Sequence, residues 1–272
     1  MNKEINLQEL KRIQLDLLDV FCAYCDKNNL TYYLTYGTLI GAVRHNGYIP
    51  WDDDIDVMMP RMDYEKFLLG FNQFPVANDV KAVSHEIDPH YYLAFAKLIN
   101  TSTTMQEEVS IDYKIGVYID IFPLDNLADD YETAKKRIRK AFRYNELMLF
   151  KNLTINSKRT WYKNAIIRVG RVISVFWSRD KLIKALNQFG IHSEDGCYTR
   201  YIGTVTGISA GDESRVFESE WFKKIVKVTF EGRKYNAPAG YDAFLKKLYG
   251  DYMKLPPLNE QITHHVYKAW YN

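Results

Sequence analysis

The sequence predicts an α+β fold, in which helices flank a small mixed sheet, and three observations support it. Apolar residues recur at helical spacing over residues 6–28, as in an amphipathic helix. Short apolar runs, such as residues 116–123, have the length of strands. Residues 225–230 alternate, a Glu-Gly turn follows, and residues 233–236 return, which predicts a β-hairpin.

Between these landmarks we expect short helices and strands to alternate. In order they are a strand at 31–36, a helix at 39–45, a strand beginning at 54, a helix at 62–71, and strands at 81–86, 92–99, 103–109 and 116–123. Gly37-Thr38 turns the first strand into the helix that follows it. Backbone N–H groups at a helix N-terminus bind phosphate, so this turn is a candidate phosphate contact.

The most informative stretch is residues 50–60, which carries four aspartates directly before an apolar run. Asp54 and Asp56 are expected to share one side of a strand, roughly 7 Å apart. Two such carboxylates can bind one hard cation, and without compensation they repel each other. Asp52 and Asp53 are equally compatible with turn or cap positions. The sequence therefore predicts a metal site built on Asp54 and Asp56.

Two further charged residues lie in predicted strands. Asp120 stands between two isoleucines, a position in which an ordinary solvent-exposed charged residue is rare. It is the natural third carboxylate of the metal site, although a buried acid in a structural ion pair has the same pattern. Lys97 shares a strand side with Phe95 and Ile99, and it fits either a phosphate contact or a solvated lysine on an edge strand.

Composition is that of an ordinary soluble globular protein, with 47% hydrophobic and 26% charged residues. Three cysteines cannot form a complete disulfide framework and fit a reducing compartment. Cys22 and Cys25 form a CxxC one helical turn apart, but no second pair supports a zinc site. The N-terminus shows no secretory signal, and residues 165–177 are too short and too charged to span a bilayer. We expect a cytoplasmic protein.

Charge is distributed unevenly along the chain. Residues 131–184 carry fifteen lysines and arginines against three acids, although the whole chain has a net charge of only +2. This segment is also apolar, with Trp161, Phe176 and Trp177, and is expected to form two or three helices. It suits an interfacial helix attracted to anionic lipid, or a helical subdomain that packs its aromatics inside. A helix is expected at 241–248, and the role of His264 and His265 stays open.

Residues 36–45 and 47–56, with the Trp-Asp-Asp-Asp-Ile-Asp signature, closely resemble the LicD family of phosphocholine transferases. The resemblance continues at 97–99, 118–125 and 241–257. It implies a nucleotidyltransferase-like fold. On this basis we expect a catalytic core at residues 1–130, a basic amphipathic helical segment at 131–190, and a C-terminal region at 191–272 that completes the core domain.

The resemblance also implies a reaction: phosphocholine passes from CDP-choline to a sugar hydroxyl of a cell-surface glycan or teichoic-acid precursor, and CMP is released. Mg²⁺ (or Mn²⁺) on Asp54, Asp56 and Asp120 would serve it. Asp120 would orient the sugar hydroxyl or accept its proton. The expected substrate contacts are Gly37, Thr38, Arg44, Trp51 and Lys97. Trp51, with Tyr36 and Tyr48, would face choline through cation–π contacts.

The implied partners are CDP-choline, a lipid-linked glycan acceptor and the inner leaflet of the membrane, with no nucleic acid. Two other enzymes remain open: a nucleotidyltransferase that attaches a nucleoside monophosphate to a small acceptor, and a related phospho-alditol transferase. A non-catalytic protein that binds nucleic acid or anionic lipid is disfavoured, because an anion-binding surface gains nothing from clustered aspartates.

Overall fold

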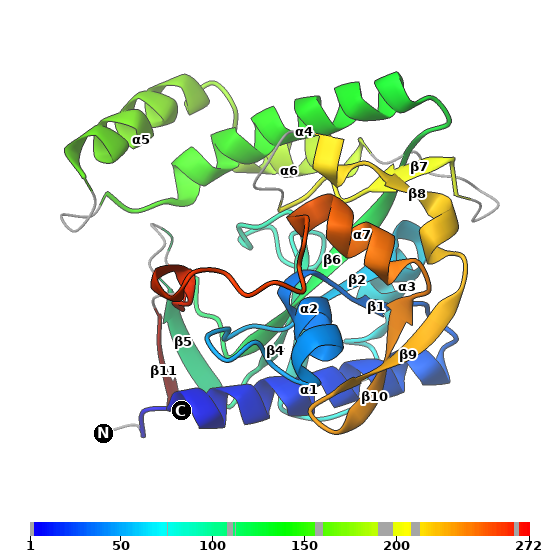
Figure 1. Cartoon of the computed structure of the whole chain (residues 1–272). Coiled ribbons are helices and arrows are strands. Elements are labelled where there is room, and N and C mark those ends of the chain that lie inside the picture. The colour runs from blue at the N-terminus through cyan, green and yellow to red at the C-terminus, as the bar shows by residue number, and fades with distance from the viewer. Residues whose placement is uncertain are drawn as a thin grey trace.

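The structure is a computed structural model, shown in Figure 1. It describes residues 3–74, 76–107, 111, 113–155, 160–189, 198–207, 213–263 and 267–272. The long helix α1 (Leu7–Lys27) runs along one side of the molecule, and α4 (Tyr131–Asn152) runs along the opposite side. The main sheet lies between these two helices (Figure 1).

Among the described residues, the main sheet has seven strands. Its principal order is β1 (Tyr33–Leu34), β2 (Asp56–Pro60), β6 (Tyr118–Ala128), β4 (Ala96–Asn100) and β3 (Val80–Val83). Two short strands, β7 (Tyr201–Gly203) and β8 (Phe217–Glu218), extend it from the far half of β6. β2 and β6 are parallel, and the other pairs are antiparallel. The predicted α+β class with a mixed sheet is confirmed.

The predicted helices form close to their expected positions. Besides α1 and α4, the described α-helices are α2 (Tyr36–His45), α3 (Arg61–Gly70), α5 (Trp161–Ser174), α6 (Arg179–Asn187) and α7 (Tyr241–Tyr249). α1 begins with a capping box, in which Asn6 and Glu9 each accept a hydrogen bond from the other's backbone N–H. The basic segment is helical as expected, since α4, α5 and α6 fill most of its described part.

Several strands differ from the prediction. β4, for example, begins at Ala96 and not at residue 92. β1 spans only two residues, because the chain turns into α2 at Tyr36, whose φ is +46°. β2 begins at Asp56, so Asp54 lies in the preceding loop and does not share a strand side with Asp56. β6 runs to Ala128, five residues further than expected, because its second half pairs with β7. Propensity along the chain could not reveal a partner strand that comes some 75 residues later.

Two smaller sheets complete the fold. The predicted hairpin is confirmed as β9 (Ile225–Phe230) and β10 (Arg233–Pro238). β5 (Thr103–Glu107) pairs with the C-terminal strand β11 (Tyr267–Tyr271). The N-terminal segment joins the same edge, since the Ile5 N–H donates to the Ala269 carbonyl at 2.8 Å. Both ends of the chain therefore lie side by side (Figure 1).

The interior has a large apolar core and a smaller one. The large core takes residues from both ends of the chain, from Ile5 to Ala269, and the smaller core lies under α4 and α6. The predicted division into three regions stays a prediction. Cys22 and Cys25 are buried in the large core, where burial raises the pKa of both thiols, that of Cys22 to about 12. A protonated buried thiol is a poor metal ligand or redox group.

Within the described part of the chain, none of the helices combines the length and the apolar character needed to span a bilayer.

Candidate active site

Three charged side chains form a row across neighbouring strands. Asp56 on β2 pairs in register with Asp120 on β6, and Asp120 pairs with Lys97 on β4. Residues paired in register project to the same face of a sheet, so the three side chains lie next to one another. The sheet thus places two of the predicted carboxylates and the predicted lysine in one row.

Lys97 is not a solvated edge lysine, because β4 lies inside the sheet and the residue is only 2% exposed. Its Nζ donates to Asp120 Oδ1 at 2.6 Å and lies 3.1 Å from the centre of the Tyr118 ring. The two readings of Asp120 are therefore compatible: it forms an ion pair and also stands beside Asp56.

The loop before β2 brings three more carboxylates together. One oxygen from each of Asp52, Asp53 and Asp54 lies within 4.8 Å of the others, which is close enough for one cation. The buried Gln14 amide on α1 donates to the Asp53 carbonyl at 2.9 Å and fixes the loop. Asp54 belongs to this group, whereas the sequence predicted it as the partner of Asp56. The sequence left the roles of Asp52 and Asp53 open between turn or cap positions and the metal site. The ligand set Asp54, Asp56 and Asp120 stays a prediction.

The carboxylates repel one another strongly. Burial, together with the charges of Asp54 and Asp53, raises the pKa of Asp52 to about 7. Burial raises the pKa of Asp56 well above its usual value, and the charges of Asp54, Asp120 and Asp52 add to it. Oxygen donors that are crowded, buried and self-repelling are the donor set that a hard divalent cation neutralises. The residues present therefore fit Mg²⁺ or Mn²⁺.

The first turn of α2 closes against these acids. Gly37 and Thr38 belong to this turn, although the sequence placed them before the helix. The Asp56 N–H donates to the Thr38 hydroxyl at 2.8 Å. A Cβ on Gly37 would lie 2.6 Å from Asp52 Oδ2, so a side chain at this position would push that carboxylate aside. Since α2 and the following loop fold back on themselves, the Gly-Thr turn adjoins the acids despite the intervening helix.

Tyr36 holds this turn in place. Its positive φ is rare for a bulky residue, and such strain persists only where the surroundings hold it. The ring packs against Phe122 with centroids 5.4 Å apart, and its hydroxyl lies 2.8 Å from Thr204 Oγ1. Arg215 lies over the ring at 5.3 Å. The Tyr36 ring, which was expected to face choline, therefore faces the guanidinium of Arg215.

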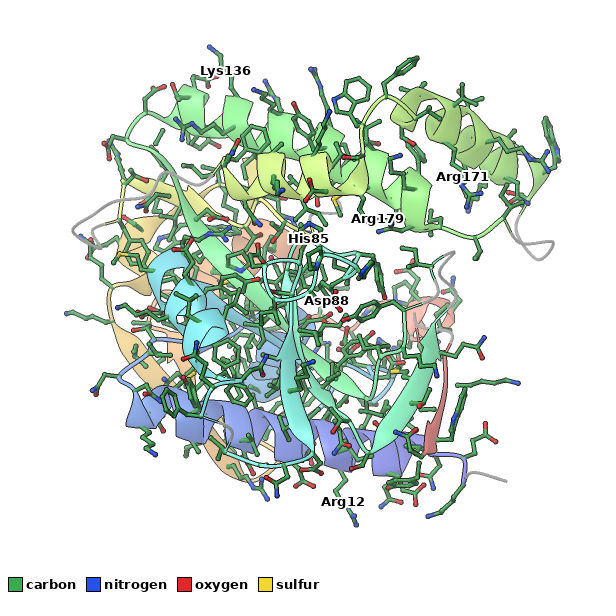
Figure 2. The ribbon with its side chains drawn as sticks, turned by 180° about the vertical axis from the view of Figure 1, so that it is seen from behind. Arg12, His85, Asp88, Lys136, Arg171 and Arg179 are labelled. Atoms are coloured by element: carbon green, nitrogen blue, oxygen red, sulfur yellow. The ribbon has the colours of Figure 1, made fainter. Side chains whose placement is uncertain are left out.

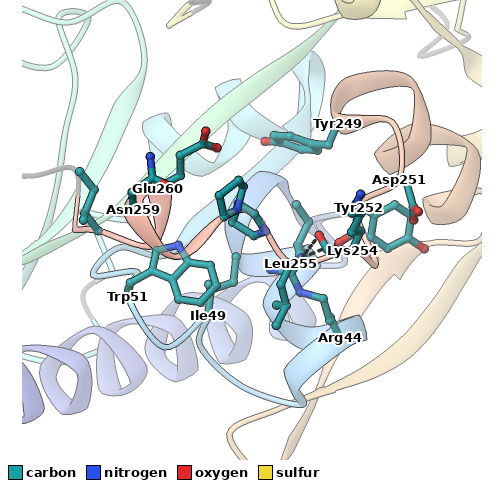
Figure 3. A pocket seen from close by; sticks show the side chains of 14 residues that line it. Arg44, Ile49, Trp51, Tyr249, Asp251, Tyr252, Lys254, Leu255, Asn259 and Glu260 are labelled. Atoms are coloured by element: carbon teal, nitrogen blue, oxygen red, sulfur yellow. Dashed lines mark hydrogen bonds between the residues drawn. The ribbon is translucent and has the colours of Figure 1, made fainter.

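A cavity of about 720 Å³ opens beside the acidic loop (Figure 3). Trp51, directly before Asp52, forms part of its wall together with Arg44 and a C-terminal segment. The lining residues of that segment are Tyr249, Asp251, Tyr252, Lys254, Leu255, Pro256, Pro257, Asn259, Glu260 and Ile262. Figure 3 shows Trp51 and Glu260 on one side of the hollow and Tyr249 on the other. The cavity therefore combines rings with carboxylates.

Arg44 has a positioning role that the sequence did not suggest. Its guanidinium donates to the backbone carbonyls of Tyr252 and Lys254, at 2.6 and 3.3 Å, and so fastens the C-terminal wall to α2. Its predicted contact with phosphate stays a prediction. Trp51 is held in turn, since its carbonyl accepts a hydrogen bond from the Thr263 hydroxyl at 3.1 Å.

Tyr48, like Tyr36, is not among the residues that line the cavity. Its hydroxyl lies 3.2 Å from the Lys11 carbonyl, and its ring packs on Phe230 with centroids 4.9 Å apart. Tyr249, which sequence reasoning missed, lines the cavity instead. The residue is 46% exposed, while burial of its hydroxyl raises the pKa of that group, and the charges of Asp56 and Asp52 add to the effect. The sequence signal for Tyr249 was its position within residues 241–257, one of the stretches that resemble the LicD family.

Comparison with known proteins agrees with this geometry. Residues 29–163 match the family described as LicD/FKTN/FKRP, nucleotidyltransferase domain. The chain is 32% identical to the lipopolysaccharide cholinephosphotransferase LicD of Haemophilus influenzae, over 98% of this chain and 99% of that protein. An uncharacterised protein of Rickettsia typhi is 38% identical over 26% of this chain and 22% of its own length. The matched family range contains the acidic loop, the first turn of α2 and the Asp56–Asp120–Lys97 row, and the chain belongs to the LicD family of phosphotransferases.

Proposed function

We propose that this protein transfers phosphocholine from CDP-choline to a sugar hydroxyl of lipopolysaccharide or a related cell-surface glycan precursor, such as a teichoic-acid precursor, and releases CMP. The observation that carries the proposal is the cluster of aspartates that directly follows Trp51, a residue that lines a cavity of rings and acids. The likeness to the lipopolysaccharide cholinephosphotransferase supports it.

The acids supply the chemistry of phosphoryl transfer. Mg²⁺ (or Mn²⁺), held by Asp54, Asp56 and Asp120 with Asp52 beside them, would neutralise the diphosphate when bound. Asp120, which accepts a hydrogen bond from Lys97 at 2.6 Å, orients the sugar hydroxyl and accepts its proton. The sugar oxygen forms a bond to the phosphorus that carries choline, and the bond from this phosphorus to the bridging oxygen breaks. CMP then leaves with that oxygen.

The cavity supplies recognition of the far group. A trimethylammonium group is bulky and weakly hydrated, so it is bound by ring faces and a nearby negative charge. Trp51, Tyr249 and Glu260 offer these features around one hollow (Figure 3). The first turn of α2, with Gly37 and Thr38, would contact phosphate through its N–H groups.

We also propose that the enzyme works as a peripheral protein at the cytoplasmic face of the inner membrane, on a lipid-linked acceptor. The exposed apolar side chains of α5 support this location, since Trp161 and Val172 are 82% and 68% exposed.

Position-specific labelling tests the reaction. CDP-choline labelled in choline should pass its label to the extracted glycan acceptor, while cytidine label should emerge as CMP. The Asp54→Asn variant, checked for folding by circular dichroism, serves as the blank. Cytidine label on the glycan would instead identify a nucleotidyltransferase and overturn the proposed reaction, because the other phosphorus would then be attacked.

A further inference from the structure

An arginine from the second half of the chain lies beside the first turn of α2. Arg215 ends the short 3₁₀ helix η1 (Glu213–Arg215), and its Cζ lies 5.3 Å from the centre of the Tyr36 ring. Exposed cations such as Arg12 and Lys136 point away from the body of the molecule (Figure 2). Arg215 is partly buried, and the ring beneath it opens the helix that adjoins the acids.

The fold fixes the backbone of Arg215. The next two residues, Val216 and Phe217, are buried, one in the smaller core and one in the large core. A side chain at Gly203 of β7 would collide with the Arg215 carbonyl, so these two segments pack closely. η1 also packs against α4 and α7. The guanidinium is therefore presented from a rigid support, as a group that orients a substrate requires.

Two tyrosines connect Arg215 with the acids and with the cavity. Burial raises the pKa of Tyr36, the charge of Arg215 opposes this rise, and the charge of Asp56 adds to it. Burial raises the pKa of Tyr249 as well, and Arg215 and Asp56 act on it with the same signs. Tyr249 lines the cavity, and its hydroxyl points across the hollow (Figure 3). A cation and an acid therefore both act on a hydroxyl group of the cavity wall.

The start of α2 is suited to an anion. Thr35, the N-cap residue, makes no side-chain hydrogen bond to the helix, so its hydroxyl does not satisfy the first N–H groups. This hydroxyl is fully buried and has no hydrogen-bond partner among the described residues. Backbone N–H groups at a helix start bind phosphate, and the planar guanidinium matches two phosphate oxygens. A phosphate between this turn and Arg215 would gain both kinds of contact.

We propose that Arg215 binds the phosphate of the donor that carries choline, next to the first turn of α2. The inference rests on the reaction proposed above and names a further residue that contacts the substrate. Tyr249 decides which phosphate is meant, because it borders the proposed choline site and is close enough to Arg215 to respond to its charge. A guanidinium at this phosphate would stabilise negative charge on its oxygens while the bond to CMP breaks.

Calorimetric titration of CDP-choline and of CMP, each with Mg²⁺, tests the contact. Arg215→Gln should weaken binding of CDP-choline by about 10- to 100-fold, the usual effect of losing a hydrogen bond to a charged group. Binding of CMP, which lacks the phosphate that carries choline, should change less than about twofold. Arg215→Lys keeps the charge without the planar pair of donors, so it should recover only part of the loss.

Arg200→Gln is the matched control. Arg200 Cζ also lies 5.3 Å from the centre of a ring, that of Tyr201, but the arginine is exposed. The control therefore removes the same kind of contact between a guanidinium and a ring, and binding of both nucleotides should stay unaltered. Thermal unfolding of each variant separates loss of binding from loss of fold. Added guanidinium ion should partly restore CDP-choline binding in Arg215→Ala, which a purely structural role would not produce.

Two results would overturn the assignment while the proposed function stands. Unaltered binding of CDP-choline in a folded Arg215→Gln variant would remove the arginine from the phosphate site. Equal losses for CDP-choline and CMP would contradict a contact with the phosphate that carries choline. A wild-type protein that binds no CDP-choline would overturn the proposed donor, and this inference with it. Transfer of labelled phosphocholine by the wild-type protein judges the proposed reaction separately.

Discussion

At the scale of single residues, the site is defined by charges that repel one another. Asp56 is 9% exposed, and the charges of Asp54, Asp120 and Asp52 add to the rise that burial causes in its pKa. The Lys97 ammonium group donates a hydrogen bond to Asp120. A buried carboxylate beside other carboxylates destabilises the metal-free protein, and a bound cation neutralises the repulsion between them.

Asp54→Asn or Asp56→Asn should lower turnover by several orders of magnitude, because each removes a charge from the predicted metal site. In the presence of EDTA at alkaline pH, Asp56→Asn should raise the melting temperature, since a repelling buried charge is lost. The control Asp16→Asn changes an exposed acid on α1 and should leave turnover unaltered. Wild-type turnover in a folded Asp54→Asn or Asp56→Asn variant at saturating Mg²⁺ would contradict the assignment.

Stability and metal binding should depend on pH through Asp52. Its folded pKa is raised from 3.8 to about 7, so its favourable contribution to stability is complete below about pH 4 and is lost as the pH rises through about 7. Mg²⁺ competes with the proton, so its affinity should rise over the same range. Thermal unfolding from about pH 5 to pH 8, with EDTA or Mg²⁺, measures both trends. Asp52→Asn should flatten them, and an identical profile in this variant would exclude Asp52 as the cause.

Trp51→Leu should reduce the preference for CDP-choline over CDP-ethanolamine, because the ring face favours the trimethylammonium group. A cation–π contact of this kind corresponds to between about twofold and thirtyfold in the ratio of kcat/KM. Tyr48→Phe is the control, since Tyr48 packs on Phe230 outside the cavity. If the ratio stays constant in Trp51→Leu, the tryptophan has a structural role only.

At the scale of elements, the decisive feature is the first turn of α2 against the acidic loop. The turn binds β2 through the Thr38 hydroxyl and makes room for Asp52 at Gly37. The strained Tyr36 lets β1 end and α2 begin within two residues. This single element therefore positions both the predicted phosphate contact and the carboxylates.

Gly37→Ala should displace the Asp52 carboxylate, because the added methyl group would lie 2.6 Å from Oδ2. A displacement of about 1 Å in a reacting site costs about 100-fold in rate, and Mg²⁺ affinity should fall with it. Steady-state kinetics and calorimetric titration of Mg²⁺ measure the two effects. The double variant Gly37→Ala/Asp52→Gly removes the clash, and partial recovery of Mg²⁺ affinity in it would assign the loss to that contact. Unchanged kinetics in Gly37→Ala would refute the steric argument.

At the scale of the whole molecule, the cavity is assembled from the two ends of the chain. α2 and the acidic loop supply one wall, and residues 249–262 supply the other. Arg44 joins the walls through two backbone carbonyls. The large core, which also spans both ends, gives this junction a rigid support.

Arg44→Gln should loosen the C-terminal wall and raise the KM for CDP-choline more than it lowers kcat. Loss of its hydrogen bonds should reduce the free energy of unfolding by about 1–3 kcal/mol. Denaturant unfolding and steady-state kinetics report the two quantities, and Arg12→Gln, at an exposed position on α1, is the control. A raised KM with unaltered stability would show that Arg44 acts on phosphate directly and does not fasten the wall.

The sequence by itself determined several local elements and predicted the kind of chemistry. Apolar periodicity was sufficient for α1 and for the β9–β10 hairpin, and the crowded aspartates indicated a cation site, because both signals lie between residues close along the chain. Only the tertiary structure decided that Gly37 meets Asp52, that Lys97 is buried against Asp120, and that residues 249–262 close the cavity. These contacts depend on how distant segments pack, and packing energy is shared among residues far apart in sequence, so no local pattern records it.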